Sequence, residues 1–340
     1  MLPESLAPRV GEEIDMEYTR LGSSGLTVSR IGYGNSQTHG GQVDDGTAHA
    51  CVRAALDLGI TVFDTADAYA RTRAEEVLGA ALSGVRREEF VLNTKVYYPT
   101  GPGTNDRGLS RKHIVEGAEG SLRRLRTGYI DVYQAHRFDY EAPLEETLTA
   151  FADLVRSGKV LYVGVSEWRA EEVAAAAPLA RELRIPLVSN QVQYSLLWRV
   201  PEAEIVPACA EEGMGVIAFS PLYQGVLTGK YRPGEQAPAD SRFGLSGSRP
   251  DAEVVERVAE VEALAREAGL TTAQLALAWL LDRDLVATAL VGASRPEQLE
   301  ASVGAVGIEL PEDLVERVEK VLEPVVVRDP SLTRSPARRP

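Results

Sequence analysis

Short apolar segments alternate with longer segments of helical periodicity along most of the chain. The apolar segments are rich in valine, isoleucine, leucine, phenylalanine and tyrosine, and they do not alternate strictly with polar residues. This pattern is typical of parallel strands that are buried on both faces. Eight such strands are predicted, at residues 31–35, 60–66, 90–96, 130–136, 160–166, 187–194, 215–222 and 287–294.

Helical patterns fill the intervals between these strands. Nine helices are predicted, at residues 44–58, 73–82, 110–125, 144–155, 170–183, 202–212, 252–268, 272–281 and 296–306. Polar residues stand where helix N-caps are expected, at Ser110, Thr271 and either Ser294 or Arg295. Glycines that suit a left-handed helix end follow five of the helices, at positions 59, 128, 158, 213 and 269.

Eight strand-then-helix units over about 270 residues predict an α/β fold, a (β/α)8 TIM barrel. The alternative is a doubly wound sheet, which is expected to carry G-x-G-x-x-G after its first strand. Here Gly32-Tyr33-Gly34 continues as Asn35-Ser36-Gln37, so the third glycine is missing. The sequence therefore favours the barrel.

Three segments lie outside the repeat. The pattern of residues 18–29 predicts an N-terminal hairpin that closes the barrel floor. Residues 223–250 are predicted to form a loop that is too long to be a simple connector. The polar, proline-rich end of the chain predicts disorder. We therefore expect a disordered leader at 1–15, a single barrel domain at 16–325 and a disordered tail at 326–340.

The composition narrows the classes of function. The chain has 340 residues and a net charge of −14, which argues against nucleic acid and anionic lipid as partners. It has neither a secretory signal nor an apolar run of the ~18 residues that a membrane span needs, so we expect a cytoplasmic protein. The two cysteines, Cys51 and Cys209, lack metal-ligand spacing, so we expect buried thiols and no metal site.

Four chemically distinctive residues fall at or just after the ends of three successive predicted strands. Asp64 lies in the second strand and Tyr69 follows it, Lys95 lies in the third, and His136 ends the fourth. Reactive residues of such barrels sit at the carboxyl ends of strands, so the four are expected to converge. Taken singly, His136 is more often a structural histidine than a catalytic one, and Asp64 could simply cap a turn. Lys95 is harder to dismiss, because a lone buried ammonium is costly and needs a partner such as Asp64.

Together these residues predict a proton donor for carbonyl reduction. A phenol titrates near ~10, and we expect the Lys95 ammonium to lower the pKa of Tyr69. Asp64 would keep Lys95 charged, Tyr69 would protonate an oxygen on which negative charge develops, and His136 would orient the carbonyl. None of the four residues supplies electrons, so a hydride cofactor is required.

The chain resembles the aldo-keto reductases from Tyr18 to about Leu322. The resemblance rests on specific motifs: 20-RLGSSGLTVSRIGYG-34, 63-FDTADAY-69, 92-LNTKV-96, 134-QAH-136, 163-VGVS-166, 218-AFSPLYQGVLTGKY-231 and 290-LVGASRPEQL-299. Within the family it is most similar to the branch that contains the potassium-channel β subunits. That likeness rests on 40-GGQ-42, 106-DRGLSRKHIVEG-117 and 241-SR-242.

The resemblance implies NADPH as cofactor, an aldehyde or ketone as the small-molecule substrate, and Asp64, Tyr69, Lys95 and His136 as the catalytic tetrad. Ser166 and Gln191 should hold the nicotinamide carboxamide, with Tyr194 near the ring. The loop 223–250 should fold over the cofactor. The remaining cofactor contacts implied by the resemblance are Gln42, Ser220, Leu222, Gln224, Gly225, Lys230, Arg242, Gly292, Ser294, Arg295 and Gln298.

The chain departs from the family pattern in three places. Glu167 stands where reductases usually have Asn or Arg, and Ala301-Ser302 replaces a Glu-Asn pair that grips the adenine. Ser36 stands where relatives often have Trp. We expect this last change to open the substrate mouth and, with His39 nearby, to favour a polar or bulky substrate.

Three interpretations of the function remain open. The first is an NADPH-dependent carbonyl reductase, and the second is a cofactor-loaded regulatory subunit that senses redox state, as in the channel branch. The channel β subunits carry Asn at the position of His136, so the histidine favours an enzyme. The third is a keto-sugar reductase of a biosynthetic pathway. Loops 97–108 and 137–143 are expected to shape the substrate pocket, and a homo-oligomer is an open expectation because close relatives form tetramers.

Overall fold

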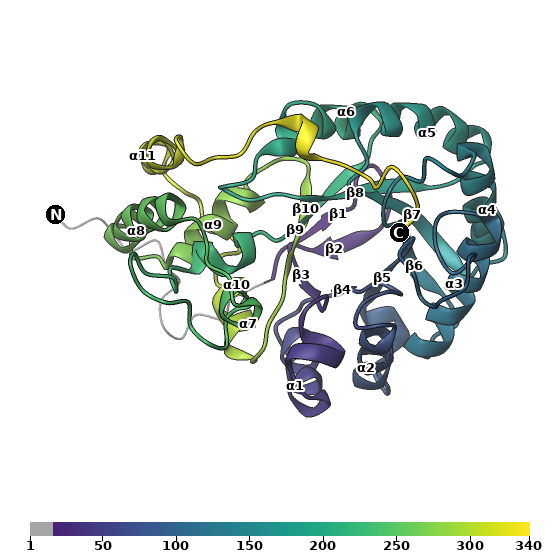
Figure 1. The fold of residues 1–340 in the computed structure, drawn as a ribbon, viewed down its shortest axis with the longest axis horizontal. Coiled ribbons are helices and arrows are strands. Elements are labelled where there is room, and N and C mark those ends of the chain that lie inside the picture. The colour runs from purple at the N-terminus through teal and green to yellow at the C-terminus, as the bar shows by residue number, and fades with distance from the viewer. Residues whose placement is uncertain (1–15) are drawn as a thin grey trace.

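Eight parallel strands close into a barrel surrounded by helices in the computed structural model, which describes residues 16–340 (Figure 1). The strands follow one another around the barrel in chain order, and β10 closes it against β3 and β9. Their bounds are β3 Ile31–Gly34, β4 Val62–Asp64, β5 Val91–Val96, β6 Ile130–Ala135, β7 Val160–Ser166, β8 Leu187–Gln193, β9 Gly215–Phe219 and β10 Val286–Val291. All eight predicted strands are confirmed, and with them the TIM barrel. The predicted leader at 1–15 lies outside the described residues.

The predicted helices are also present. They are α1 Asp45–Asp57, α2 Arg73–Ala81, α3 Arg111–Leu125, α4 Leu144–Arg156, α5 Ala170–Glu182, α6 Ile205–Glu211, α8 Ala252–Glu267, α9 Thr272–Leu281 and α10 Glu297–Val303. Ser110 caps α3 by accepting from the His113 amide, and Thr271 forms a capping box with Gln274. The predicted cap at Ser294 or Arg295 is wrong, because Pro296 occupies that position without a side-chain bond. Arg126, rather than Gly128, takes the left-handed conformation after α3.

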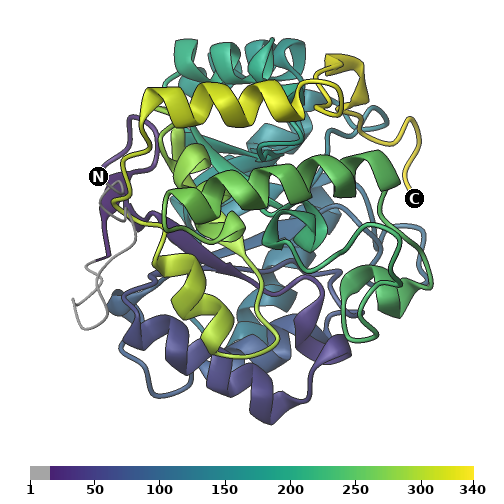
Figure 2. The same ribbon diagram turned by 90° about the vertical axis from the view of Figure 1, so that its left-hand side faces the viewer.

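Helix α11, Glu312–Leu322, was not predicted. Its buried residues Leu314, Val318 and Leu322 recur every four positions, so the signal was present in the sequence. The helix packs alongside α8, and the two run side by side (Figure 2). Together they close the side of the barrel next to the long loop.

The barrel interior is apolar at its floor. The hairpin of β1 Tyr18–Arg20 and β2 Thr27–Ser29 places Leu21 and Val28 against inward-facing valines of the barrel, including Val62 and Val132. The hairpin turn fits closely, because a Cβ on Gly22 would lie 2.5 Å from the Gly213 carbonyl oxygen. The predicted hairpin at the barrel floor is therefore confirmed. Polar side chains lie at the opposite end of the barrel, where the strands have their carboxyl ends.

The long loop 223–250 is partly regular. It contains the short helix η4, Tyr223–Thr228, and α7, Arg242–Ser246. The amide of Gln42, in the short helix η1 Thr38–Gln42, donates to the Asp240 carbonyl at 3.3 Å, so the loop reaches across to the segment that follows β3.

The tail 326–340 runs along the barrel (Figure 1). Val327 exchanges backbone hydrogen bonds with Leu197 and Arg199, and Arg339 pairs with the buried carboxylate of Asp139 at 2.8 Å. Within the described residues, Arg339 is the cation that pairs with Asp139. The disorder of this tail stays a prediction.

None of the helices in the described part of the chain is both long and apolar enough to cross a membrane.

Candidate active site

Lys95 is the centre of a polar cluster at the carboxyl ends of β4 and β5. Its side chain is fully buried, and its ammonium donates three hydrogen bonds. The acceptors are Asp64 Oδ1 at 2.6 Å, the Thr65 carbonyl oxygen at 2.7 Å and the Tyr69 hydroxyl at 3.3 Å. An ammonium has three donors, so all three are used. The structure thus brings together Asp64, Tyr69 and Lys95 as the sequence predicts.

The second oxygen of Asp64 is held by two amides that complete a polar layer across the barrel. Asn93 donates to Oδ2 at 2.6 Å and Gln191 donates to it at 2.7 Å. Gln134 in turn donates to Asn93 at 2.7 Å. Sequence reasoning missed Asn93, although it lies two residues before Lys95 on β5 and therefore faces the same side of the strand.

The charge of Lys95 is maintained in spite of its burial. Burial alone would lower the pKa of Lys95, but Asp64 and Tyr69 outweigh it and hold the pKa above its ordinary value. For Tyr69 the balance is the reverse of the expectation. Burial raises the pKa of Tyr69 by more than Lys95 lowers it, so the net shift is upward. Tyr69 therefore stays protonated at neutral pH.

His136 lies beside the phenol, so the fourth predicted residue joins the cluster. Its ring meets the Tyr69 ring edge-on at 5.7 Å and the Tyr98 ring at 4.9 Å between centroids. Burial, with Lys95 and Arg137 nearby, lowers the pKa of His136 well below its usual range. The imidazole is therefore neutral, and its Nδ1 has no hydrogen-bond partner among residues 16–340.

The residues predicted to hold the nicotinamide are only partly brought together. Ser166 ends β7 and accepts from Arg137 at 3.4 Å, and Gln191 lies on Asp64 as described. Tyr194 follows β8, its hydroxyl donates to Glu202 at 2.8 Å, and its ring packs edge-on against Trp279. Its place near the nicotinamide ring stays a prediction.

Two of the departures from the family pattern are explained by local bonds. Glu167 is in the left-handed conformation, and its carboxylate accepts from the Gln193 amide at 2.7 Å, which ties β7 to β8. Ser302 is buried, and its hydroxyl donates to the Gln298 carbonyl at 2.8 Å. Ser302 therefore uses its hydroxyl within α10.

Three cations among the predicted cofactor contacts are exposed: Lys230 and Arg242 lie in the long loop, and Arg295 follows β10. None of Lys230, Arg242 and Arg295 forms an ion pair within residues 16–340. Partial burial lowers the pKa of Lys230, and the nearby Arg295 acts in the same direction. Partial burial also lowers the pKa of Arg242. Such unpaired positive charge suits an anion.

The chain that leads to Lys230 turns through several left-handed residues. Ser220, Tyr223, Gln224 and Gly225 all have positive φ angles, between 45° and 86°. The φ of 86° at position 225 favours glycine, and a Cβ there would lie 2.7 Å from the end of the Lys230 side chain. The other predicted contacts nearby are the half-buried Leu222 and the exposed Gly292, and Gln298, whose Oε1 accepts from the Ser294 amide at 2.8 Å.

The hypothesis about Ser36 and His39 is wrong for the histidine. Ser36 is exposed, but His39 is buried, with its Nε2 2.9 Å from the Tyr33 hydroxyl and its Nδ1 3.1 Å from the Asn35 amide. Both ring nitrogens are engaged, so His39 is not available to a substrate.

The burial of His39 and His113 predicts a loss of stability in mild acid. Burial lowers the pKa of each to about 4, against 6.5 when unfolded. The unfolded chain therefore binds more protons between pH 4 and 6.5, so stability is fully present above 6.5 and falls as pH drops through that window. Each histidine should contribute about 3 kcal/mol to the change. Urea unfolding at several pH values should show the fall, and His39→Gln should remove about a third of it, because the buried His136 also has a lowered pKa. A stability independent of pH across this window would contradict the assignment.

Comparison with known proteins agrees with the geometry. The family model described as "Aldo/keto reductase family" matches residues 30–323. The chain is 39% identical over 321 residues to a "Probable voltage-gated potassium channel subunit beta" of Arabidopsis thaliana, covering 91% of this chain and 97% of that protein. It is 40% identical over 331 residues to a protein of the same name in Oryza sativa subsp. japonica, covering 94% and 99%.

The structure and the comparisons agree with one another. The structure provides the barrel and the cluster around Lys95, and the comparisons provide the family match and relatives at about two-fifths identity over nearly their whole length. The resemblance to the channel β-subunit branch is also confirmed. The chain belongs to the aldo/keto reductase family.

Proposed function

We propose that this protein reduces an aldehyde or ketone to an alcohol with NADPH, and that Tyr69 donates the proton. One observation carries the proposal. The Tyr69 hydroxyl oxygen accepts from Lys95, and among the described residues it donates to no acceptor. The phenol proton is therefore free for an oxygen that enters the mouth of the barrel.

The residues around Tyr69 suit this role. As the proton leaves, the phenolate that forms stays beside the Lys95 ammonium, which stabilises the negative charge. Asp64 holds the ammonium, so that it does not lose its own proton instead. The neutral imidazole of His136 can donate one hydrogen bond to the same carbonyl oxygen and fix its orientation.

The cations near the long loop suit a phosphorylated cofactor. Lys230, Arg242 and Arg295 form no ion pair in the described chain, and Gly225 of the long loop lies against the Lys230 side chain. We assign the phosphates of NADPH to this region and its nicotinamide to the end of β7 at Ser166. When bound, NADPH supplies the hydride that no side chain can provide.

Replacing Lys230 and Arg242 together by glutamine should weaken NADPH binding about ten- to a hundredfold, because charge-assisted hydrogen bonds to phosphate are lost. NADH, which lacks the 2′-phosphate, should be affected less. Quenching of tryptophan fluorescence would measure both affinities, with the exposed Arg184→Gln as a control outside the site. Equal losses for the two cofactors would show that these cations do not recognise the 2′-phosphate.

A panel of aldehydes, diketones and keto-sugars tests the proposal and the substrate class together. Purified protein with NADPH should consume the cofactor only when a carbonyl is present, with alcohol formed in equal amount. Preference for keto-sugars would support the biosynthetic interpretation. Consumption that does not depend on any carbonyl would exclude a reductase.

A redox-sensing subunit is the second candidate, and the names of the two plant relatives favour it. Such a subunit would bind NADPH tightly, turn over little and co-purify with a membrane protein. The histidine at position 136 and the free Tyr69 proton favour the enzyme instead.

A further inference from the structure

The turn that follows Tyr69 is held in a strained conformation. Ala70, Arg71 and Thr72 have φ angles of 48°, 54° and 74°, a left-handed run that side chains disfavour. Thr72 precedes α2, yet its side chain does not cap the helix. Neither the turn nor the start of the helix is therefore held by its own local bonds alone.

A buried ion pair ties the first turn of α2 to two other elements. The Glu75 side chain is fully buried, and its two oxygens have different partners. Arg124 of α3 donates to Oε2 at 2.6 Å, and Thr94 of β5 donates to Oε1 at 2.6 Å. Thr94 is the residue before Lys95 and points to the opposite face of β5, so the ion pair anchors α2 to the strand that carries Lys95.

Backbone hydrogen bonds connect the segment around Tyr69 to β5 on one side and to α2 on the other. The Asp67 amide donates to the Lys95 carbonyl at 3.2 Å, and the Ala74 amide donates to the Tyr69 carbonyl at 3.3 Å. Tyr69 thus lies between a link to Lys95 and a link to the first turn of α2. Asp67 is buried nearby, and burial, followed by the charge of Glu75, raises its pKa well above its usual range.

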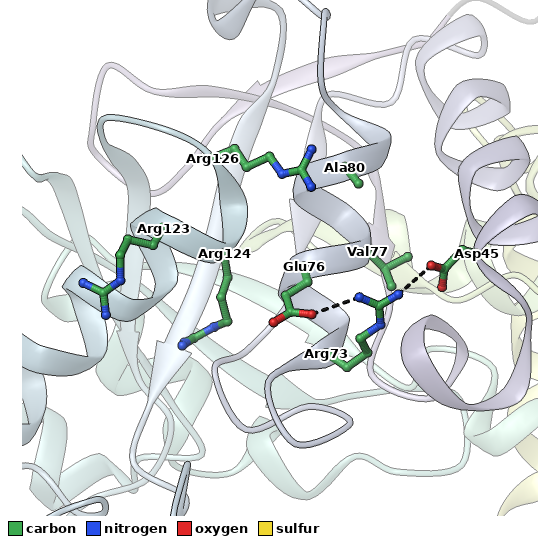
Figure 3. A pocket seen from close by; sticks show the side chains of 8 residues that line it. All are labelled: Asp45, Arg73, Glu76, Val77, Ala80, Arg123, Arg124 and Arg126. Atoms are coloured by element: carbon green, nitrogen blue, oxygen red, sulfur yellow. Dashed lines mark hydrogen bonds and ion pairs between the residues drawn. The ribbon is translucent and has the colours of Figure 1, made fainter.

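The outer edge of the ion pair borders a surface pocket between α2 and α3 (Figure 3). The pocket has a volume of about 430 Å³ and does not include any tetrad residue; it is lined by Asp45, Arg73, Glu76, Val77, Ala80, Arg123, Arg124 and Arg126. Figure 3 shows Arg73 bridging Asp45 and Glu76, at 2.6 and 2.9 Å. Arg73, Asp45 and Glu76 therefore pair with one another, and Arg124 pairs with Glu75.

We propose that Glu75, Thr94 and Arg124 form a clamp that holds the strained turn 70–72 and thereby positions the Tyr69 hydroxyl on Lys95. The three are positioning residues, since none contacts the hydroxyl itself. The proposal rests on the proposed function in so far as Tyr69 is the proton donor.

The double variant Glu75→Gln/Arg124→Gln tests the clamp. It removes both charges together, so no unpaired charge is left buried. Its control is Asp131→Asn/Arg87→Gln. Arg87 is as exposed as Arg124, at 19% of its side chain, and its partner Asp131 also bonds β5, but through the Leu92 amide at the far end of the strand. The two variants therefore remove similar pairs from opposite ends of β5.

The clamp variant should lower kcat about ten- to a hundredfold, because a small displacement of the proton donor has a large effect on rate. KM and the NADPH affinity should change by less than about twofold, and the alkaline limb of the pH–rate profile should move. Tyr69, whose titration this limb reports, faces Lys95, Asp64, His136 and Arg137. The control variant should keep the wild-type kcat and profile even where urea unfolding shows equal destabilisation.

Amide hydrogen exchange separates this proposal from the proposed function. Residues 65–74 should exchange faster in the clamp variant and at the wild-type rate in the control, whether or not the protein reduces carbonyls. Unchanged exchange, an unchanged kcat, or equal losses in both variants would overturn the clamp. Absence of turnover in the wild type alone would count against the proposed function and leave the exchange result to decide on the clamp.

Discussion

Tyr69→Phe is expected to lower kcat for carbonyl reduction about a hundred- to ten-thousandfold, the usual contribution of a general acid. The variant loses the phenol proton, which has no acceptor among the described residues, while Lys95 keeps its bonds to Asp64 and Thr65. NADPH affinity should stay within about twofold. Steady-state kinetics and tryptophan quenching would measure the two quantities on the same samples.

Tyr162→Phe is the matched control. Tyr162 lies on β7 and packs against the apolar floor of the barrel, at the end away from the tetrad, so removal of its hydroxyl should leave kcat nearly unchanged. If Tyr69→Phe retained the wild-type rate while Tyr162→Phe did not, the assignment of the proton donor would be wrong.

Lys95→Met is expected to have the largest combined effect on stability and activity. It leaves the Asp64 carboxylate buried without a cation, which should reduce the free energy of unfolding by about 3–5 kcal/mol. Reduction should also be lost, because nothing then stabilises the Tyr69 phenolate. Urea unfolding and single-turnover reduction would measure the two losses separately.

The double variant Asp64→Asn/Lys95→Met distinguishes the two effects. Without the buried charge it should recover most of the stability, but none of the activity. Recovery of activity along with stability would show that Lys95 acts only in folding.

Much of the fold could be predicted, because the apolar runs of the strands and the helical periodicity of the helices depend only on the residues of each segment. The tetrad could also be predicted, since barrel topology brings strand ends to one face regardless of detail. Asn93 was missed, although its spacing from Lys95 contained the signal.

Other features could not be predicted because they depend on pairs distant in sequence. The upward shift of the Tyr69 pKa arises from how deeply neighbouring chains bury it, and only the net of burial and charge decides the sign. The Glu75–Arg124 pair and the anchoring of the tail by Asp139 join residues about 50 and 200 positions apart. His39 was expected near the substrate mouth, but its contacts with Tyr33 and Asn35 hold it in the interior.

The most direct measurement of the central claim is deuterium transfer. Purified protein would be incubated with NADPH carrying deuterium at the transferable position of the nicotinamide and with an aldehyde that it consumes. We expect each alcohol molecule formed by the wild type to carry one deuterium on the former carbonyl carbon, and Tyr69→Phe to form this product at least about a hundredfold more slowly. Tight NADPH binding without any deuterated alcohol, across the whole carbonyl panel, would contradict the account of this protein as a reductase.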